Sequence, residues 1–370
     1  MRKVVVAGVG MHPCGIWPDK ERSEIALTAI INALEDSQVP FKDIQKVYCS
    51  HVLEGASIAQ IICQKIGLIG VPMINMENAC TSGSTAMGEA YFAIATGQYD
   101  VALVIGVEQM SNMGVLGGVA DTKSLDSLLG MNIMPALYAM NANEHMHKYG
   151  TTREQLALVA VKNKKNGTIN PYAHIRKEFT LEEVLGSRRI VDPITLLMCC
   201  PNSDGGAAAI LCAEDVLSKY NSKPKVYMAG TALRTYAYGE NSNDLNRRAA
   251  KDAYEMAGVD PKDVDVAEVH DAFTIGEIMH YETLGFCPLG EGGRFLEEGH
   301  TQITGDIAVN PSGGLQSRGH PLGMTGVAQA CEVVWQLRQE AKGRQVNNPK
   351  VGLCHTQGAG GVACVNIFTL

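Results

Sequence analysis

A weak internal duplication places the strongest constraint on this 370-residue chain. Three short stretches recur in the same order in its N-terminal and C-terminal parts: 3–8 (KVVVAG) with 225–230 (KVYMAG), 39–44 (VPFKDI) with 259–264 (VDPKDV), and 101–106 (VALVIG) with 351–356 (VGLCHT). One such match arises easily by chance, but three in one order indicate a repeat, and repeats decide architecture. Apolar runs typical of buried strands alternate with helical patterns in both parts. We therefore predict two similar α/β halves with largely parallel sheets, at residues 1–220 and 221–370.

An insertion is predicted inside the first half, at about residues 111–200, where strong strand patterns are absent. A helix is expected to begin there after Thr151 or Thr152 as the N-cap. The insertion is locally basic, with Lys162, Lys164, Lys165, Arg188 and Arg189. Most charges of this kind lie on a solvated surface, and the alternative interpretation is a contact region for an anionic ligand.

The stretch from Asn78 to Ala86 (NACTSGSTA) separates a short apolar run, 71–76, from a pattern whose apolar residues recur every three or four positions. Cys80 is thereby predicted where a strand passes to a helix N-terminus, among residues too small to cover it. Free N–H groups and the helix dipole stabilise a thiolate there, and the thiolate is the nucleophilic form of cysteine. An inert buried cysteine is the common alternative, and this stretch alone leaves both interpretations open.

Two further stretches place histidines where catalytic groups of α/β proteins gather, at the carboxyl ends of strands. His270 and Asp271 end an apolar run in the stretch EVHDAF. A neutral imidazole there can donate to an oxyanion, although capping or a structural hydrogen bond is the commoner role of such a pair. His320 lies between a glycine and a proline in NPSGG…RGHPLG, which lacks the spacing of a phosphate loop. A rigidly held histidine suits a general base or an oxyanion donor.

The last glycine-rich stretch, CHTQGAGG, follows a predicted strand near the end of the chain. Backbone N–H groups of such a turn can form an oxyanion hole. Successive side chains of a strand point to opposite faces, so only one of Cys354 and His355 can face a site.

Composition excludes several classes of function. The net charge of −8 argues against a broad nucleic-acid surface, and no apolar run reaches the roughly 20 residues of a membrane helix. The apolar N-terminal run is broken by His12 and Pro13 without a cleavage site, which favours a first strand over a signal peptide. Eleven cysteines without CxxC spacing predict reduced thiols in the cytoplasm and no metal site.

Four motifs in this order, NACTS, EVHDAF, NPSGG with GHPLG, and HTQG, resemble the thiolase superfamily over essentially the whole chain. The resemblance is close to the sterol-carrier-protein-type and archaeal-type branch, whose members are acetyl-CoA acetyltransferase-like. It implies two βαβαβ-based halves in a five-layer αβαβα arrangement, with a loop domain inserted in the first half. It also implies a homodimer or a dimer of dimers.

The resemblance implies ping-pong acyl transfer, with coenzyme A thioesters as substrates and no bound cofactor. Cys80 would take the acyl group, and His320 would activate Cys80 and hydrogen-bond the thioester oxygen. His270 would share that oxyanion role, and the N–H groups of Cys80 and Gly358 would hold the tetrahedral oxyanion. Ser312, in the NPSGG motif, is predicted to contact the substrate.

The chain departs from the family in its second acid/base group. Many thiolases carry a cysteine where His355 stands here, and sterol-carrier-type relatives carry one at the position of Ala272. We predict that His355 moves the proton, because the pKa of histidine lies near working pH. Tyr138, His145 and His51 are weaker candidates for this role, and His145 is also predicted to line the substrate pocket.

The same motifs leave two other functions open. A retro-aldolase on an acyl-CoA, or a C-acyltransferase to a non-CoA acceptor, would need a base and an oxyanion site but not the second cysteine. A non-catalytic acyl-CoA-binding subunit is the third interpretation, and the retention of Cys80 with three histidines argues against it. Relatives of this branch commonly work with a small zinc-ribbon, OB-fold partner protein, which the resemblance therefore implies here.

Overall fold

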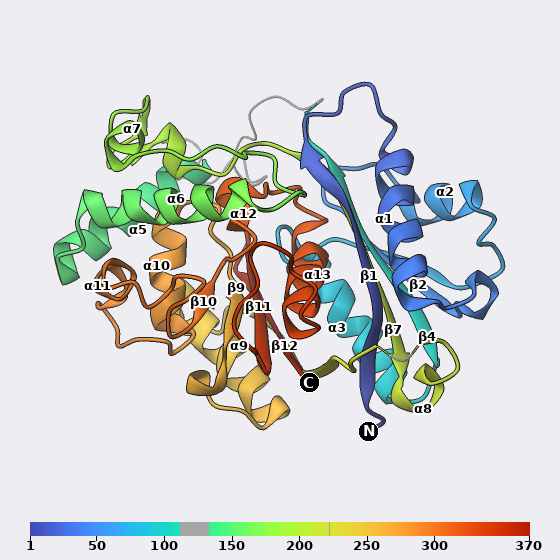
Figure 1. Ribbon diagram of the computed structural model, residues 1–370. Coiled ribbons are helices and arrows are strands. Elements are labelled where there is room, and N and C mark those ends of the chain that lie inside the picture. Colours follow the sequence, from blue (N-terminus) through green and yellow to red (C-terminus); the bar gives the residue numbers. More distant parts are fainter. Residues whose placement is uncertain (112–132, 222) are drawn as a thin grey trace.

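The computed structural model describes residues 1–111, 133–221 and 223–370 of the chain. Within them, ten strands form one mixed sheet that consists of two sets of five (Figure 1). The first set, in the spatial order β3-β2-β4-β7-β1, comprises β1 (Val4–Gly15), β2 (Lys46–Ser50), β3 (Met73–Met76), β4 (Val101–Gln109) and β7 (Asp204–Ala213). The second set, in the order β10-β9-β11-β12-β8, comprises β8 (Tyr227–Thr235), β9 (Val266–Glu268), β10 (Ala308–Val309), β11 (Val351–Gly358) and β12 (Val362–Thr369).

The two sets repeat one topology. Numbered along the chain within its own set, each has the spatial order third, second, fourth, fifth, first. The repeated sequence stretches fall on counterpart elements: β1 and β8, the short 3-10 turns Phe41–Asp43 and Pro261–Asp263, and β4 and β11. A single residue pair, Val5 with Tyr227, joins the sets. The duplication inferred from sequence therefore appears in the strand order, while the boundary at residue 220 stays a prediction.

The expectation of largely parallel sheets needs correction. In each set two neighbouring pairs are parallel, β2 with β3 and with β4, and β9 with β10 and with β11. The remaining pairs, formed by β7 and β12, are antiparallel. The physical reason is plain for β12, because only residues 359–361 join it to β11, and a parallel crossover needs a dozen residues or more.

Helices complete five layers. α3 (Ser82–Ala95) and α13 (Thr325–Leu337) lie between the two sets of strands and contact both of them (Figure 1). The outer face of the first set is covered by α1 (Arg22–Ser37) and α2 (Ile58–Lys65), with the short α8 (Glu214–Leu217) after β7. The second set is covered by α9 (Ser242–Ala257) and α10 (Thr274–Thr283), followed by α11 (Gly292–Glu297) and α12 (Gly314–Ser317). The predicted five-layer α/β fold is thus confirmed.

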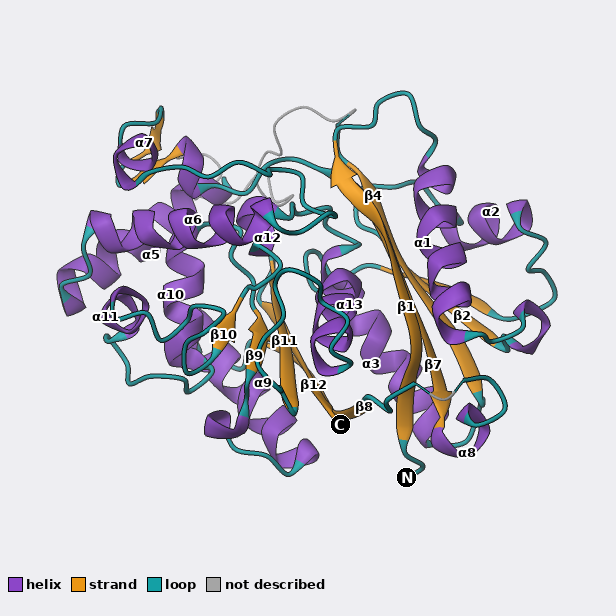
Figure 2. Cartoon of the chain, in the orientation of Figure 1, coloured by secondary structure: helices purple, strands orange, loops and turns teal. Residues whose placement is uncertain are grey.

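The inserted region packs against one end of the second half. It contains α5 (Met134–Tyr149), α6 (Arg153–Thr168), α7 (Leu181–Leu185) and the hairpin of β5 (Arg189–Val191) with β6 (Ile194–Thr195). α5 and α6 contact α10, and α6 also contacts α11 and α12 (Figure 2). Thr152 caps α6 by accepting from the Gln155 N–H, as the sequence predicts. Residues 112–132 of this predicted insertion lie outside the described part.

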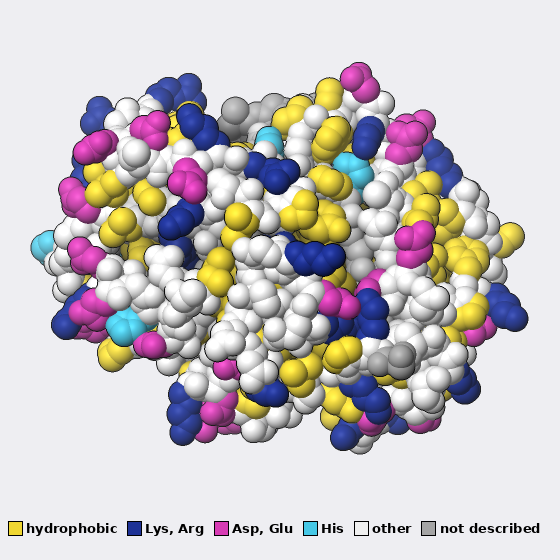
Figure 3. Space-filling view, viewed as in Figure 1, with side chains coloured by type: hydrophobic (Ala, Val, Ile, Leu, Met, Phe, Trp, Pro, Cys, Tyr) yellow, Lys and Arg dark blue, Asp and Glu magenta, His cyan; other side chains and the backbone are white. Residues whose placement is uncertain are grey.

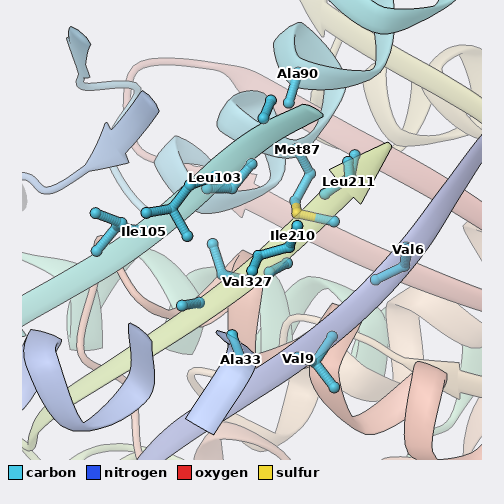
Figure 4. Packing of buried hydrophobic residues seen from close by; sticks show 14 of the residues in the cluster. Val6, Val9, Ala33, Met87, Ala90, Leu103, Ile105, Ile210, Leu211 and Val327 are labelled. Atoms are coloured by element: carbon cyan, nitrogen blue, oxygen red, sulfur yellow. The ribbon is translucent and has the colours of Figure 1, made fainter. Parts of the chain in front are cut away.

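The core fixes how the two central helices meet. Met87 and Ala90 of α3 pack against Leu103 of β4 and Leu211 of β7, with Val327 of α13 close by (Figure 4). Near their N-termini the two helices are in backbone contact. A Cβ on Gly83 would lie 2.9 Å from the Gly326 nitrogen, and one on Gly326 would lie 2.1 Å from the Ser84 nitrogen. Glycine at both positions therefore lets the two helix N-termini touch.

The distribution of charge on the surface agrees with the expectation that the protein has no broad basic surface for nucleic acid. On the face shown in Figure 3, basic and acidic side chains are interspersed. Among the described helices, none combines the length and apolar character that crossing a membrane requires.

Candidate active site

Cys80 lies in the turn between β3 and α3, two residues before the helix begins. The preceding residue, Ala79, has a left-handed backbone with φ of 48°, which an L-residue adopts only when the surrounding fold enforces it. The end of β11 provides that constraint, because a Cβ on Gly358 would lie 2.8 Å from the Asn78 carbonyl oxygen and 3.3 Å from the Ala79 Cβ. The nucleophile candidate is thus held by the contact between the first and second halves.

The environment of the Cys80 sulfur differs from the sequence-based expectation. Burial raises the pKa of Cys80 to about 12, although hydrogen bonds from the backbone N–H groups of Cys80 and Ala359 lower it. The predicted stabilisation by N–H groups is present, but desolvation of the charge outweighs it. The group is therefore a neutral thiol at neutral pH, and the expectation of a resting thiolate is wrong. The N–H group beside the sulfur belongs to Ala359, one residue after the predicted Gly358.

His320 is placed to take the proton from this thiol. Its Nε2 lies 3.3 Å from the Cys80 sulfur, and its Nδ1 lies 2.8 Å from the Thr325 hydroxyl oxygen. The Thr325 hydroxyl donates its one hydrogen to the Pro321 carbonyl (2.9 Å), so it accepts from Nδ1–H. Nε2 consequently carries the lone pair that faces the thiol. Burial, together with His270 and Arg318, lowers the pKa of His320 well below 6.5, so the ring is neutral and its Nε2 is free to accept a proton.

The tautomer of His320 can be tested by replacing Thr325. Replacement by valine keeps the shape of the side chain but removes the acceptor of Nδ1–H, so both ring tautomers become accessible. We expect the alkylation of Cys80 by iodoacetamide at pH 7.5 to slow about tenfold, as part of the general-base contribution is lost. The rate would be followed by intact mass. Thr325→Ser retains the hydroxyl and should react like wild type, whereas equal rates for valine and serine would contradict the tautomer assignment.

His270 completes a compact group with Cys80 and His320. One ligand atom from each of the three side chains lies within 4.8 Å of the others, a spacing that a soft divalent cation can also use. The rings of His270 and His320 meet edge to face, with centroids 5.1 Å apart. Burial lowers the pKa of His270 to about 4, so this ring is also neutral. Its Nε2 has no partner among the described residues, which leaves one nitrogen available to a substrate oxygen.

Tyr138, on α5 of the inserted region, adds a phenol to this group. Its hydroxyl lies 3.5 Å from His270 Nδ1, and its ring stacks on Phe273 with centroids 4.6 Å apart. Burial raises the pKa of Tyr138 above its usual range, and the neighbouring Cys80 and Cys200 act in the same direction. The phenol is therefore a neutral donor beside His270.

His355 does not belong to the compact group of Cys80, His270 and His320. Its Nε2 lies 2.9 Å from the Asn246 amide oxygen, and its ring centroid lies 4.2 Å from that of His280. Burial, reinforced by His270, lowers the pKa of His355 to about 3, so the expected match between its pKa and working pH is wrong and the ring is neutral. Cys354, the next residue back, packs in the core, so the predicted alternation along this strand is observed.

Comparison with known proteins identifies the family. Residues 4–215 match the family model for the thiolase N-terminal domain, and residues 241–368 match the model for the thiolase C-terminal domain-like family. The chain belongs to the thiolase family. It is 41% identical to an acetyl-CoA acetyltransferase of Methanothermobacter thermautotrophicus over the full length of both chains. It is 37% identical to bovine sterol carrier protein 2, matching all of this chain and 72% of that protein.

Solved structures agree with this assignment at the level of the fold. A structure described as the Ltp2-ChsH2(DUF35) aldolase superposes with a TM-score of 0.87 at 23% identity, covering 99% of this chain and 97% of that one. The predicted membership of the thiolase superfamily is therefore confirmed by sequence, and the arrangement of its halves by structure.

Two predicted substrate contacts of this thiolase-family chain are occupied within the protein. The Ser312 hydroxyl donates to Glu268 (2.7 Å) in a fully buried network. His145 is buried, with Nδ1 2.7 Å from the Thr151 hydroxyl and Nε2 3.1 Å from a Glu282 oxygen. The polar atoms that were predicted to bind a substrate are already hydrogen-bonded to other side chains of the protein. Ser312 and His145 therefore hold the surrounding loops and helices in place.

The basic cluster of the insertion also needs correction. Lys162 and Lys164 are buried, and they bind the Val309 carbonyl (2.8 Å) and the Gln316 carbonyl (2.9 Å). They point inward because the buried face of α6 lies against α10, where Lys162 also pairs with Glu277, and against α12; burial lowers the pKa of Lys164 to about 8. Lys165, Arg188 and Arg189 remain at the surface.

Asp271 contacts the start of a neighbouring helix through structural hydrogen bonds. Its carboxyl group accepts the N–H of Leu315 (2.7 Å) at α12 and the side-chain amide of Asn163 (2.8 Å), and burial together with Glu277 raises its pKa to about 8. His51 is buried with no partner for either ring nitrogen among the described residues, next to the backbone of Gly323.

Sequence reasoning missed three residues that contact the side chains of this site. Thr325, which sets the tautomer of His320, and Ala359, whose N–H group faces the sulfur, lie inside or beside the motifs and could have been found from spacing. His280, which packs against His355, stands ten residues after His270 on a helix without any motif signal.

Proposed function

We propose that this protein is a CoA-dependent thiolase, an acetyl-CoA C-acyltransferase that forms or cleaves a 3-ketoacyl-CoA through an acyl group on Cys80. The observation that carries the proposal is the pairing of the Cys80 thiol with the neutral Nε2 of His320, 3.3 Å away. Full-length similarity to a protein named acetyl-CoA acetyltransferase supports the substrate class. Nucleophile, base and orienting hydroxyl together form the arrangement required for acyl transfer.

In the first half-reaction, Cys80 attacks the thioester carbonyl while His320 Nε2 accepts the thiol proton. The negative charge that develops on the carbonyl oxygen lies close to the sulfur, where the N–H groups of Cys80 and Ala359 are already oriented. Collapse breaks the bond between the carbonyl carbon and the CoA sulfur. His320 then returns its proton to that sulfur, which leaves acyl-Cys80 and neutral His320.

In the second half-reaction, an acyl-CoA loses a proton from C2, and its enolate attacks the acyl group on Cys80. A carbon–carbon bond forms, the carbon–sulfur bond to Cys80 breaks, and the Cys80 thiolate regains one proton. Neutral His270 and His320 are the groups that would donate to the enolate oxygen. We propose that His355 accepts the C2 proton, which is the role of the second cysteine in other thiolases.

The intact pair of Cys80 and His320 favours acyl transfer over the retro-aldol alternative, which requires no acyl-cysteine. The proposal also includes assembly as a homodimer or dimer of dimers and association with a small partner protein. The two-part name of the Ltp2-ChsH2(DUF35) aldolase is consistent with a partner in a protein of this fold. All eleven cysteines are free, which suits a reducing cytoplasm.

The test is direct detection of the acyl-enzyme. The protein would be incubated with acetyl-CoA and with a panel of 3-ketoacyl-CoAs, quenched in acid and examined by intact and peptide mass. We expect an acyl adduct on the Cys80 peptide that is absent from Cys80→Ala. The measurement would be repeated with any small protein that co-purifies. Absence of an adduct under all these conditions, despite measurable CoA binding, would overturn the thiolase proposal in favour of an aldolase or a binding subunit.

A further inference from the structure

Three side chains of the active site present metal-binding atoms to one another. Among the described residues, Cys80, His270 and His320 form the one group of at least three Cys, His, Asp or Glu side chains whose ligand atoms all lie within 4.8 Å of one another. They are far apart in the sequence, so the prediction of no metal site, which rested on the absence of closely spaced cysteines, does not apply to them. Thiolate and imidazole are ligands that zinc prefers.

His320 already has the form of a metal ligand. Its Nδ1–H donates to the Thr325 hydroxyl oxygen (2.8 Å), so the lone pair of Nε2 faces the Cys80 sulfur at 3.3 Å. A tetrahedral zinc ion, with bonds of about 2.0–2.1 Å to nitrogen and about 2.3 Å to sulfur, holds two such ligand atoms about 3.5 Å apart. The sulfur and this nitrogen therefore already lie at nearly the separation that one ion requires. The hydrogen bond from Thr325 fixes the orientation of the ring, as outer partners of metal-bound histidines do.

His270 supplies a second nitrogen that the protein leaves free. The residue is 2% exposed, and its Nε2 has no partner among the described residues. A buried polar atom of this kind calls for an explanation, and a ligand is one. On the other side of the ring, the Tyr138 hydroxyl lies 3.5 Å from Nδ1 and can accept its hydrogen, which leaves the lone pair on Nε2. Because no hydrogen bond restrains Nε2, the ring can turn toward an ion held by Cys80 and His320.

Charge and access also suit a cation. Besides burial, the charges of Glu108 and Glu77 raise the pKa of Cys80 because they repel a thiolate, and the same charges attract a divalent cation. Cys80 is partly exposed, which gives an ion a route to the group from solvent. Three protein ligands leave the fourth tetrahedral position open to water.

We propose that Cys80, His270 and His320 form an inhibitory zinc site. On binding, the S–H bond of Cys80 breaks and its proton passes to solvent, while the sulfur and one nitrogen of each histidine donate electron pairs to the ion. Zinc is neither oxidised nor reduced. The ion then occupies both the nucleophile and its base, so it blocks acyl transfer until a chelator removes it. The metal site rests on the geometry alone, whereas its inhibitory effect rests on the thiolase function proposed above.

The metal site is tested with cobalt and zinc on the full chain. The protein is freed of metal with a chelator and reduced with a phosphine that is removed before titration. Cobalt bound to a thiolate shows a sulfur-to-metal charge-transfer absorption, and zinc affinity is measured by competition with a chromophoric chelator. Cys80→Ser removes the thiolate, and Cys287→Ala, at another partly exposed free cysteine, is the matched control.

We expect one cobalt per chain with charge-transfer absorption in wild type and Cys287→Ala, and no such absorption in Cys80→Ser. Zinc affinity should fall more than about a hundredfold in Cys80→Ser and His270→Gln, which each lose a bond to the metal. It should fall about tenfold to a hundredfold in Thr325→Val, which loses only the hydrogen bond that orients His320. Thr325→Ser should bind zinc like wild type.

Full zinc affinity or a retained charge-transfer absorption in Cys80→Ser would place the metal elsewhere and overturn the proposal. Failure of the wild type to bind zinc in competition with the chelator would also overturn it. Equal affinities of Thr325→Val and Thr325→Ser would remove His320 from the site, with the same consequence, and this comparison holds even if His270→Gln does not fold.

The inhibitory effect is tested by acetylation of Cys80. With acetyl-CoA freed of CoA thiol, one equivalent of zinc should slow adduct formation on the Cys80 peptide by at least about a hundredfold, the contribution of the general base that the ion occupies. Excess chelator should restore the rate, and Cys287→Ala should respond like wild type. Undiminished acetylation of the zinc-bound protein would overturn the inhibitory role. An adduct that is missing without zinc would instead overturn the proposed function, while the cobalt absorption would still report the metal site.

Discussion

Replacing His320 by glutamine is expected to slow acylation of Cys80 by about a thousandfold, within the usual contribution of a positioned general base. The thiol, whose pKa burial raises to about 12, needs an acceptor for its proton as it attacks, and His320 Nε2 is the group that contacts the sulfur. Glutamine retains a donor for the thioester oxygen but cannot take the proton. The acylation rate constant would be measured by rapid quench with saturating acetyl-CoA. His12→Gln, at a buried histidine that contacts the Pro13 carbonyl in β1, is the matched control.

The pH dependence of the same step follows from the two neutral groups. The pKa of His320 lies well below 6.5, so the base is deprotonated above that pH, while the pKa of Cys80 is about 12. Protonation of His320 should reduce the rate only on the acid side. We expect a constant acylation rate from pH 6.5 to about 9, because neither group changes its charge in that window. A rate that rises with a midpoint near 7 would contradict a neutral resting pair.

The residues that the sequence located are those whose position depends mainly on the backbone. Cys80 and His320 each precede the first turn of a central helix, and the duplication brings those helices together. Recognising the repeat therefore predicts that Cys80 and His320, 240 residues apart in the sequence, lie close together. The direction of β12 was accessible from its three-residue turn, but an alternation of strand and helix does not reveal which neighbours run antiparallel.

The residues that sequence reasoning misplaced depend on which side chains the tertiary structure buries. Ser312 and His145 carry polar atoms within or near the family's motifs, yet Glu268 and Glu282 occupy those atoms inside the protein. His280 depends on which face of α10 turns inward, and a nearly wholly buried helix gives no amphipathic signal. The thiolate expectation failed for the same reason, because desolvation is a property of the assembled site.

Replacing Arg318 by methionine is expected to destabilise the protein by about 3–5 kcal/mol at pH 8, the usual effect of removing one partner from a buried ion pair. Arg318 Nη1 lies 3.1 Å from Glu268 Oε2, and the two side chains are 1% and 0% exposed. Each stands two residues before an active-site histidine, so the pair joins the loop of His320 to the loop of His270. Unfolding by urea would be compared at one protein concentration, because assembly contributes to apparent stability. Arg294→Met, at an exposed pair, should change stability by less than about 1 kcal/mol.

The sign of the pH effect distinguishes a buried charge from a simple packing defect. Burial raises the pKa of Glu268 to about 7 even though Arg318 lowers it, so losing the arginine raises that pKa further. A carboxyl whose pKa is higher in the folded state than in the unfolded state contributes stability at low pH that is lost as pH rises through the folded value. The penalty of Arg318→Met should therefore be smaller at pH 6 than at pH 8. Adding Glu268→Gln to Arg318→Met removes the buried negative charge and should recover much of the lost stability at pH 8. If instead the loss of stability does not depend on pH and the second substitution does not reduce it, Arg318 stabilises the loops by packing alone.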